Sequence, residues 1–187
     1  GALGHVRVAA VAVAALVVVA GCRPGTPDGG FGEGGTAVLA GAPAGEDVSA
    51  APAGDGGTVV ARDGDGGGAS PGGGGELVRL GPDGSVVAGW GGPTPVACAE
   101  RDELDRHRDG YVLACTSTAE DGTRATHVVR YTDAGRPDRR FGAGGVVALA
   151  GEVEGAAAVP LPGGRVLVLG GRPPRAGEPP VLVRSVL

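Results

Sequence analysis

The chain lacks five residue types altogether. Its 187 residues include no lysine, methionine, asparagine, glutamine or isoleucine, and aromatic side chains make up only 3%. Since residues with AT-rich codons are the missing ones, we infer a gene from a GC-rich genome. Any apolar core must be built from Val, Leu and Ala. The abundant types are turn formers, with 40 Gly and 15 Pro, so we expect short elements separated by many turns.

Strong positive charge is also absent. The formal net charge is −5 and the isoelectric point is about 5.2. Nucleic-acid binders carry a basic patch, often interleaved with aromatic residues, and no such stretch occurs here. The glycine runs lack the GK[ST] ending of a phosphate-binding loop, and the GxSxG motif of serine hydrolases is missing. We therefore expect no nucleic-acid partner, no cofactor, no metal ion and no catalytic residue.

One long apolar run stands near the N-terminus. Residues 8–20, VAAVAVAALVVVA, lie between Arg7 and Gly21. A helix of 13 residues is about 20 Å long, which is too short to cross a hydrocarbon core of about 30 Å. Its length and flanking residues are typical of a secretory signal. We predict an N-terminal signal helix within residues 1–21, and therefore an exported protein.

The end of this run matches a modification motif. Val19, Ala20, Gly21 and Cys22 resemble the lipobox of bacterial lipoproteins, an aliphatic residue and two small residues before a cysteine. The resemblance implies that the Cys22 thiol carries a diacylglyceryl group and that the signal is removed before it. The mature chain, residues 22–187, would then be anchored at the outer face of the cell membrane. The alternatives are secretion through a plain signal peptide, or a buried apolar segment with an incidental cysteine.

Two further cysteines remain. Cys98 and Cys115 both stand in strand-like contexts, PVACAE and YVLACTS. An even pair in an exported chain is typical of a disulfide, which here would stabilise the fold by roughly 3 kcal/mol. The alternative is two separately buried thiols. Two cysteines without nearby histidines do not make a zinc site.

The sequence repeats itself. GTPDGGFGEGG at residues 25–35 and GRPDRRFGAGG at residues 135–145 agree at seven of 11 positions. Three columns share one register: a Gly before an apolar run (Gly57, Gly110, Gly164), an Arg after an apolar pair (Arg79, Arg130, Arg184), and an aromatic-Gly pair (Phe31-Gly32, Trp90-Gly91, Phe141-Gly142). They predict a repeat of about 50–60 residues, in units of roughly 25–84, 85–135 and 136–187.

Short Val/Leu/Ala runs fill these units between Gly/Pro/Asp clusters, which indicates antiparallel all-β structure. We expect about four strands per unit: 36–40, 47–51, 58–62 and 76–80; then 95–99, 111–115 and 127–131 with an irregular charged connection; then 146–150, 155–159, 165–169 and 181–185. Four antiparallel strands are the blade of a β-propeller. The predicted fold is about three such blades, propeller-like, after the signal helix. Since propellers use about 4–8 blades, closure within one chain stays open.

The repeat resembles a known family. VRYTDAGRPDRRFGAGGVV, residues 129–147, is similar to the delta-60 repeat of bacterial surface and secreted proteins. That motif has a strand ending in Arg, a turn, then an Asp, a Phe-Gly pair and a Gly pair. Its matches here are Arg130, Gly135, Asp138, Phe141, Gly142, Gly144 and Gly145, with Asp28, Phe31, Gly32, Gly34 and Gly35 repeating the second half. The resemblance implies propeller-like blades in an exported protein and assigns no catalytic residue.

The densest polar cluster is AERDELDRHRDG, residues 99–110, which contains Asp102, Asp105, His107 and Asp109. Carboxylates beside a histidine can perform acid–base chemistry or bind a cation. Charges of alternating sign over a short connection are more typical of a solvated face. Of all the polar stretches, this cluster is our first candidate for a partner surface.

These features favour an exported, lipid-anchored protein that serves as a non-catalytic binding or surface scaffold for an extracellular ligand or protein. Assembly into a homo-oligomer is left open. One alternative is an extracytoplasmic enzyme with a polar site near residues 100–109. The other is a truncated reading frame without a function of its own. Ser117, His127 and Asp121 could be combined into a catalytic triad, but no motif connects them.

Overall fold

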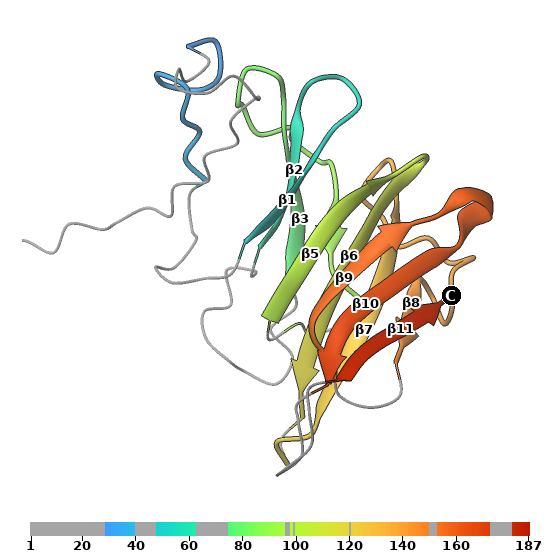
Figure 1. Cartoon of the computed structure of the whole chain (residues 1–187). Helices are drawn as coiled ribbons and strands as arrows, with labels where there is room; N and C mark the ends of the chain where they lie inside the picture. Colours follow the sequence, from blue (N-terminus) through green and yellow to red (C-terminus); the bar gives the residue numbers. More distant parts are fainter. Residues whose placement is uncertain are drawn as a thin grey trace, which may run out of the picture.

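The described part of the computed structural model contains three antiparallel β-sheets (Figure 1). The structure describes residues 29–39, 48–62, 75–95, 98, 100–119, 121–149, 153–172 and 181–187. The all-β prediction is confirmed. The predicted signal helix and Cys22 lie outside the described residues. In the described part, no helix is long and apolar enough to span a membrane.

Each sheet is a meander in which consecutive strands pair. Sheet 1 contains β1 (Ser49–Pro52), β2 (Thr58–Arg62), β3 (Glu76–Leu80) and β4 (Gly92–Pro93). Sheet 2 contains β5 (Glu100–His107), β6 (Gly110–Thr118), β7 (Arg124–Thr132) and β8 (Val146–Ala148). Sheet 3 contains β9 (Glu154–Pro160), β10 (Val166–Arg172) and β11 (Val181–Val186), with a short 3-10 helix, η1 (Pro162–Gly164), between β9 and β10. None of the three sheets closes on itself.

The sheets stack face to face with sheet 2 in the middle. Side chains along a strand point alternately to its two faces, so β6 contributes residues to the contacts with both sheet 1 and sheet 3. Tyr111, Leu113 and Cys115 join a buried cluster with the strands of sheet 1. Val112 and Ala114 join a second cluster with β9 and β10 of sheet 3. Sheets 1 and 3 therefore lie on opposite faces of sheet 2.

The first strands of the three sheets are neighbours. β5 contacts both β1 and β9, and the Leu104 N–H donates to the Ser49 hydroxyl at 2.7 Å. The later strands of each sheet lie progressively farther from this shared row. The outer strands β4 and β8 lie at the opposite edges of sheets 1 and 2 from this row.

Two segments differ from their expected place. The charged stretch that we predicted to be an irregular connection forms β5 and its hairpin turn, so that prediction is wrong. It forms a strand because Leu104 fills the cluster between sheets 1 and 2, and because its residues pair with β6 on both sides of an irregularity at Asp102. Val146–Ala148, which the repeat frame sets at the start of the third unit, pairs with β7 as the outer strand of sheet 2.

Candidate functional site

The four residues proposed as a partner surface lie on β5 and the turn that follows it. Asp102 and Asp105 are in the strand, His107 is its last residue, and Asp109 is in the hairpin turn. His107 is buried, with 8% of its surface exposed, and Asp105 is half-buried. Asp109 is exposed. The stretch is therefore not one solvated face, and of Asp105, His107 and Asp109 only the last is freely accessible.

Asp105 and His107 share one face of β5, because they are two residues apart. Asp105 pairs with Val112, which packs toward sheet 3. The opposite face carries Leu104 and Arg106 toward sheet 1. The Asp105 carboxylate accepts the N–H of Arg106 at 2.7 Å, a local bond within the strand.

A stack of two arginines and two aromatic rings connects sheets 1 and 2. The Arg79 guanidinium lies 5.8 Å from the Trp90 ring, and the Arg106 guanidinium lies 5.6 Å from the Tyr111 ring. The two rings meet edge to face, with centroids 5.9 Å apart and an angle of 87°. Trp90 comes from the end of sheet 1 and also donates its indole N–H to the Asp133 carbonyl of sheet 2 at 3.0 Å. Such contacts each contribute about 0.5–2 kcal/mol, so this stack fixes one sheet on the next.

Acidic side chains flank the stack at both ends. Arg79 pairs with Asp55, in the turn between β1 and β2. Arg106 pairs with Asp133 at 3.5 Å and reaches the Pro52 carbonyl of sheet 1 at 3.4 Å. Burial raises the pKa of Tyr111, and the nearby Arg106 charge partly offsets this rise. The phenol is therefore neutral at ordinary pH and acts as a packed ring and hydrogen-bonding group.

A third arginine–aromatic pair occupies the boundary between sheets 2 and 3. The Arg130 guanidinium lies 5.7 Å from the Phe141 ring, forms an ion pair with Asp138 at 2.9 Å, and donates to the Gly164 carbonyl of sheet 3 at 3.1 Å. Arg79 precedes Trp90 by 11 residues, and Arg130 precedes Phe141 by the same interval. The sequence aligned these arginines in one column, but only the structure shows that each lies over its own aromatic ring.

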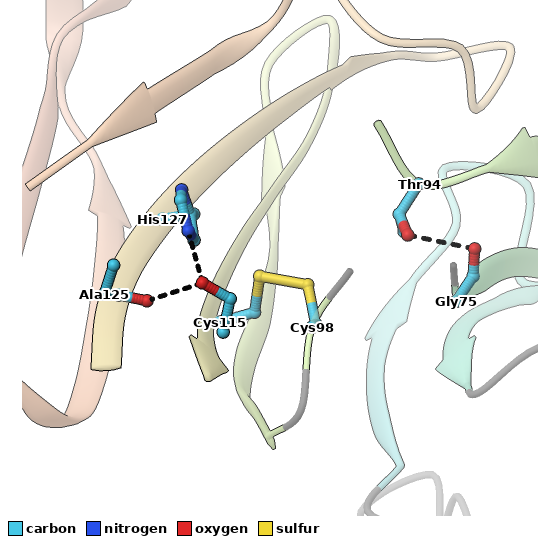
Figure 2. Close-up of a disulfide and its surroundings, with 7 residues drawn as sticks. Gly75, Thr94, Cys98, Cys115, Ala125 and His127 are labelled. Atoms are coloured by element: carbon cyan, nitrogen blue, oxygen red, sulfur yellow. Dashed lines mark hydrogen bonds between the residues drawn. A yellow bond between two sulfur atoms is a disulfide. The ribbon is translucent and has the colours of Figure 1, made fainter. Parts of the chain in front are cut away.

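The predicted cysteine pair is brought together. The sulfur atoms of Cys98 and Cys115 lie at bonding distance, with Cα atoms 5.6 Å apart, consistent with the expected disulfide (Figure 2). Cys98 belongs to the segment that leads from sheet 1 to sheet 2, and Cys115 lies in the centre of β6. The bond therefore attaches the connection between two sheets to the middle strand of the second.

His127 lies across from Cys115 on β7 (Figure 2). It contacts Ser117, although no sequence motif connects these two residues. The Ser117 hydroxyl oxygen is 2.8 Å from His127 Nε2 and 3.4 Å from the Ala125 carbonyl oxygen. Asp121 takes no part and accepts the N–H of Thr123 at 2.8 Å. Burial lowers the pKa of His127, so the ring is neutral near pH 7.

The proton of this ring is best assigned to Nε2. His127 Nδ1 is buried without a partner among the described residues, and a buried N–H without an acceptor is rarer than a lone pair without a donor. The ring then donates to Ser117, and the Ser117 hydroxyl donates to Ala125. A general base needs the reverse direction, with the serine donating to the ring. The pair therefore forms a polar link between β6 and β7.

Several aspartates act as turn formers. Asp55, Asp83 and Asp121 each accept a backbone N–H two residues later. These bonds lower the pKa of Asp55 and Asp121. The Ser85 hydroxyl together with the Ser85 N–H lowers the pKa of Asp83. Such Asx turns favour the tight reversals that the sheets require. No group of three His, Cys, Asp or Glu side chains within the described ranges could hold a metal ion.

One shallow depression of about 380 Å³ lies on sheet 1, bordered by Arg62, Glu76, Val86 and Trp90. Arg62 and Glu76 form an ion pair with each other on neighbouring strands. The charged side chains at its border therefore satisfy each other.

Comparison with known proteins gave no match: no family model, no curated protein and no solved structure is similar to this chain.

Proposed function

We propose that this protein is an exported, lipid-anchored scaffold of propeller-like blades that binds an extracellular partner without catalysing a reaction. The observation that carries the proposal is the segment Val19, Ala20, Gly21, Cys22 after the apolar residues 8–20. Each CH₂ buried in a bilayer contributes about 0.8 kcal/mol, so a diacylated Cys22 would hold the chain on a membrane stably.

The stacking of the sheets supports a propeller-like scaffold. In a propeller, four-stranded meanders pack face to face around a common axis, with their first strands innermost. β1, β5 and β9 are such a row of first strands, and each sheet contacts the next through one apolar face. The same arginine–aromatic pair recurs at both sheet boundaries. A fold held by repeated contacts of this kind offers rigid turns for a partner to bind.

The end of the stack that carries the β5–β6 turn is the best surface for that partner. Asp109 is exposed there, and the Asp133 side chain of the neighbouring turn is 65% exposed. Since both are acidic on an acidic protein, the partner surface that fits them is basic or rich in hydrogen-bond donors.

The anchor is tested by following the processing of Cys22→Ala in a bacterial host. Wild-type protein should incorporate an alkyne-labelled fatty acid and enter the membrane fraction, and globomycin should block its cleavage. Cys22→Ala should lose both label and cleavage, whereas Cys98→Ala, which keeps Cys22, should retain both. Membrane fractionation and processing that are the same in Cys22→Ala as in wild type would refute the anchor.

A further inference from the structure

The third sheet has an edge that differs from the other two. β3 and β7, the third strands of sheets 1 and 2, each pair with a short outer strand, β4 and β8. In the part of the chain that the structure describes, β11 pairs with β10 alone. Its last residue, Val186, is 47% exposed. The N–H and C=O groups along such an edge can pair with an additional strand.

A segment near the N-terminus has the sequence of an outer strand. Residues 27–40, PDGGFGEGGTAVLA, match residues 137–150, PDRRFGAGGVVALA, at eight of 14 positions. The second run contains β8, the outer strand of sheet 2. The described part of the first run, residues 29–39, forms only isolated bridges within itself and belongs to none of the three sheets.

The backbone of the two runs is the same. Gly32 and Gly142 have φ values of 55° and 53°, and a side chain at either position would collide with a backbone carbonyl. Two hydrogen bonds recur with equal lengths: Gly35 N–H to Phe31 C=O and Gly145 N–H to Phe141 C=O at 2.9 Å, and Glu33 N–H to Thr36 C=O and Ala143 N–H to Val146 C=O at 2.8 Å. The turn that leads into an outer strand is therefore already formed at residues 31–36.

The segment also packs on sheet 1 in the same way as the end of one sheet packs on the next sheet in the stack. The Gly32 N–H donates to the Asp83 carbonyl in the turn after β3 at 2.8 Å, just as the Gly91 N–H at the end of sheet 1 donates to Ala134 in the turn after β7 at 3.3 Å. Ala37 and Leu39 are buried against the outer face of sheet 1. Val147 and Leu149, their counterparts in the second run, pack toward sheet 3. Residues 31–39 thus occupy the position of an outer strand from a preceding sheet.

The same chain cannot use this segment to extend β11. Sheets 1 and 3 lie on opposite faces of sheet 2, and residues 29–39 are held on the far face of sheet 1 (Figure 1). Pairing them with β11 of the same chain would require the stack to come apart. A second copy has no such constraint, because residues 29–39 and the β11 edge lie at the two outer ends of its stack of sheets.

We propose that a second copy of this chain binds here, with Thr36–Leu39 of one copy added as a strand along β11 of the other. The exposed face of sheet 3 fits this partner. Val159, Leu167 and Val186 form one cross-strand row, in which Val159 is 37% and Val186 is 47% exposed, and the sheet 1 face of the second copy would cover it. The contact joins the N-terminal segment of one copy to the β11 edge of the other. Two copies that each donate the segment and each accept one form a closed ring. Two copies supply six sheets, within the range of about 4–8 blades that closed propellers use.

The pairing N–H groups can be assigned from β8. Arg130 N–H donates to Gly145 C=O, and Leu149 N–H donates to Thr126 C=O. Since pairing groups alternate along an antiparallel strand, Val147 also faces β7, whereas the Ala148 N–H points away. In the N-terminal segment, the equivalent of Val147 is Ala37 and the equivalent of Ala148 is Val38. Ala37→Pro therefore removes a pairing donor, and Val38→Pro removes one on the opposite side, which an edge strand tolerates.

The test is native mass spectrometry of the full chain released from mild detergent. We expect a wild-type dimer, loss of the dimer in Ala37→Pro, and a retained dimer in Val38→Pro, with equal strand content for all three by circular dichroism. A wild-type chain that stays monomeric at every concentration overturns the proposal. So does a dimer that both proline variants keep or both lose.

A peptide provides a second measurement that does not depend on a folded variant. A synthetic peptide of residues 27–40, added in excess, should convert the wild-type dimer into a monomer carrying one peptide. The same peptide with the Ala37→Pro change should leave the dimer intact. If neither peptide binds, or both bind equally, strand addition at β11 is refuted. This proposal does not depend on the lipid anchor, because globomycin and Cys22→Ala leave residues 31–39 unchanged.

Discussion

Reduction of the Cys98–Cys115 disulfide is expected to lower the free energy of unfolding by about 3 kcal/mol. The two cysteines are 17 residues apart, and their Cα atoms lie 5.6 Å apart in the folded chain. In the chain-entropy description, a bond that closes a loop of this length restricts the unfolded chain by about 3 kcal/mol. The unfolded population should therefore rise about 100-fold when the bond is reduced.

The folded state should change little on reduction. Cys98 is 4% exposed and Cys115 is fully buried, so both thiols stay packed as small apolar groups. Cys115 is also held in β6 by pairing with Arg101 of β5 and His127 of β7. The loss of stability is thus expected to come from the unfolded chain, which becomes freer and more expanded.

The assay is urea unfolding with and without a phosphine reductant, followed by the fluorescence of Trp90, the single tryptophan. Trp90 reports on the contact between sheets 1 and 2 because its ring meets Tyr111 there. The control is the double variant Cys98→Ala, Cys115→Ala, whose unfolding should not respond to reductant. A wild-type shift below about 0.5 kcal/mol, or an equal shift in the double variant, would show that the bond does not restrict the unfolded chain.

Three further predictions follow from local geometry. Arg130→Met should cost about 1–3 kcal/mol in urea unfolding, because it leaves the Asp138 carboxylate and the Gly164 carbonyl without their donor; a double-mutant cycle with Asp138→Asn that shows no coupling would contradict this. Burial lowers the folded pKa of His127 below 6.5, so the unfolded chain binds more protons and stability present above pH 6.5 falls as the pH drops toward the folded pKa; His127→Gln should reduce the loss of stability between about pH 7.5 and 5, and an unchanged pH profile would refute it. Gly144→Ala should cost about 1–2 kcal/mol through its positive φ alone, whereas Gly142→Ala should cost more because its Cβ would lie 2.1 Å from a backbone oxygen; thermal unfolding that ranks the two variants in the other order would contradict the turn geometry.

Strands were predictable from the sequence where they are apolar and buried on both faces. Val59, Val60 and Ala61 form a fully buried run in β2, and the run at residues 111–115 is buried in β6, as short apolar runs between turn formers predict. β5 was not predicted as a strand because it contains only one apolar residue, Leu104, and therefore shows no apolar–polar alternation. Its conformation is set by pairing with β6 and by contacts to β1, which are long-range and leave no local signal.

The candidate site was predictable only as a set of residues. The cluster at residues 102–109 was visible as a run of charge, but the burial of His107 depends on its place at the end of a hairpin between two sheets. The contact of Ser117 with His127 arises from the register of β6 on β7, which no motif encodes. The arginine column was visible in the sequence, whereas its stacking on Trp90 and Phe141 requires the turn to fold back over the strand.

The sequence by itself determined the all-β class and the turn positions, because glycine, aspartate and short apolar runs act on the backbone locally. It favoured a disulfide between Cys98 and Cys115, and the structure brings the two sulfur atoms together. The proposed export signal and lipid anchor rest on the sequence alone, in residues 1–22. Tertiary structure decided which strand belongs to which sheet, which face of β6 meets which neighbour, and that residues 31–39 lie on sheet 1 as an outer strand without a sheet of their own. These features depend on packing between segments that are far apart in the chain. The stabilising free energy comes from burying complementary apolar faces, which no short stretch of sequence specifies.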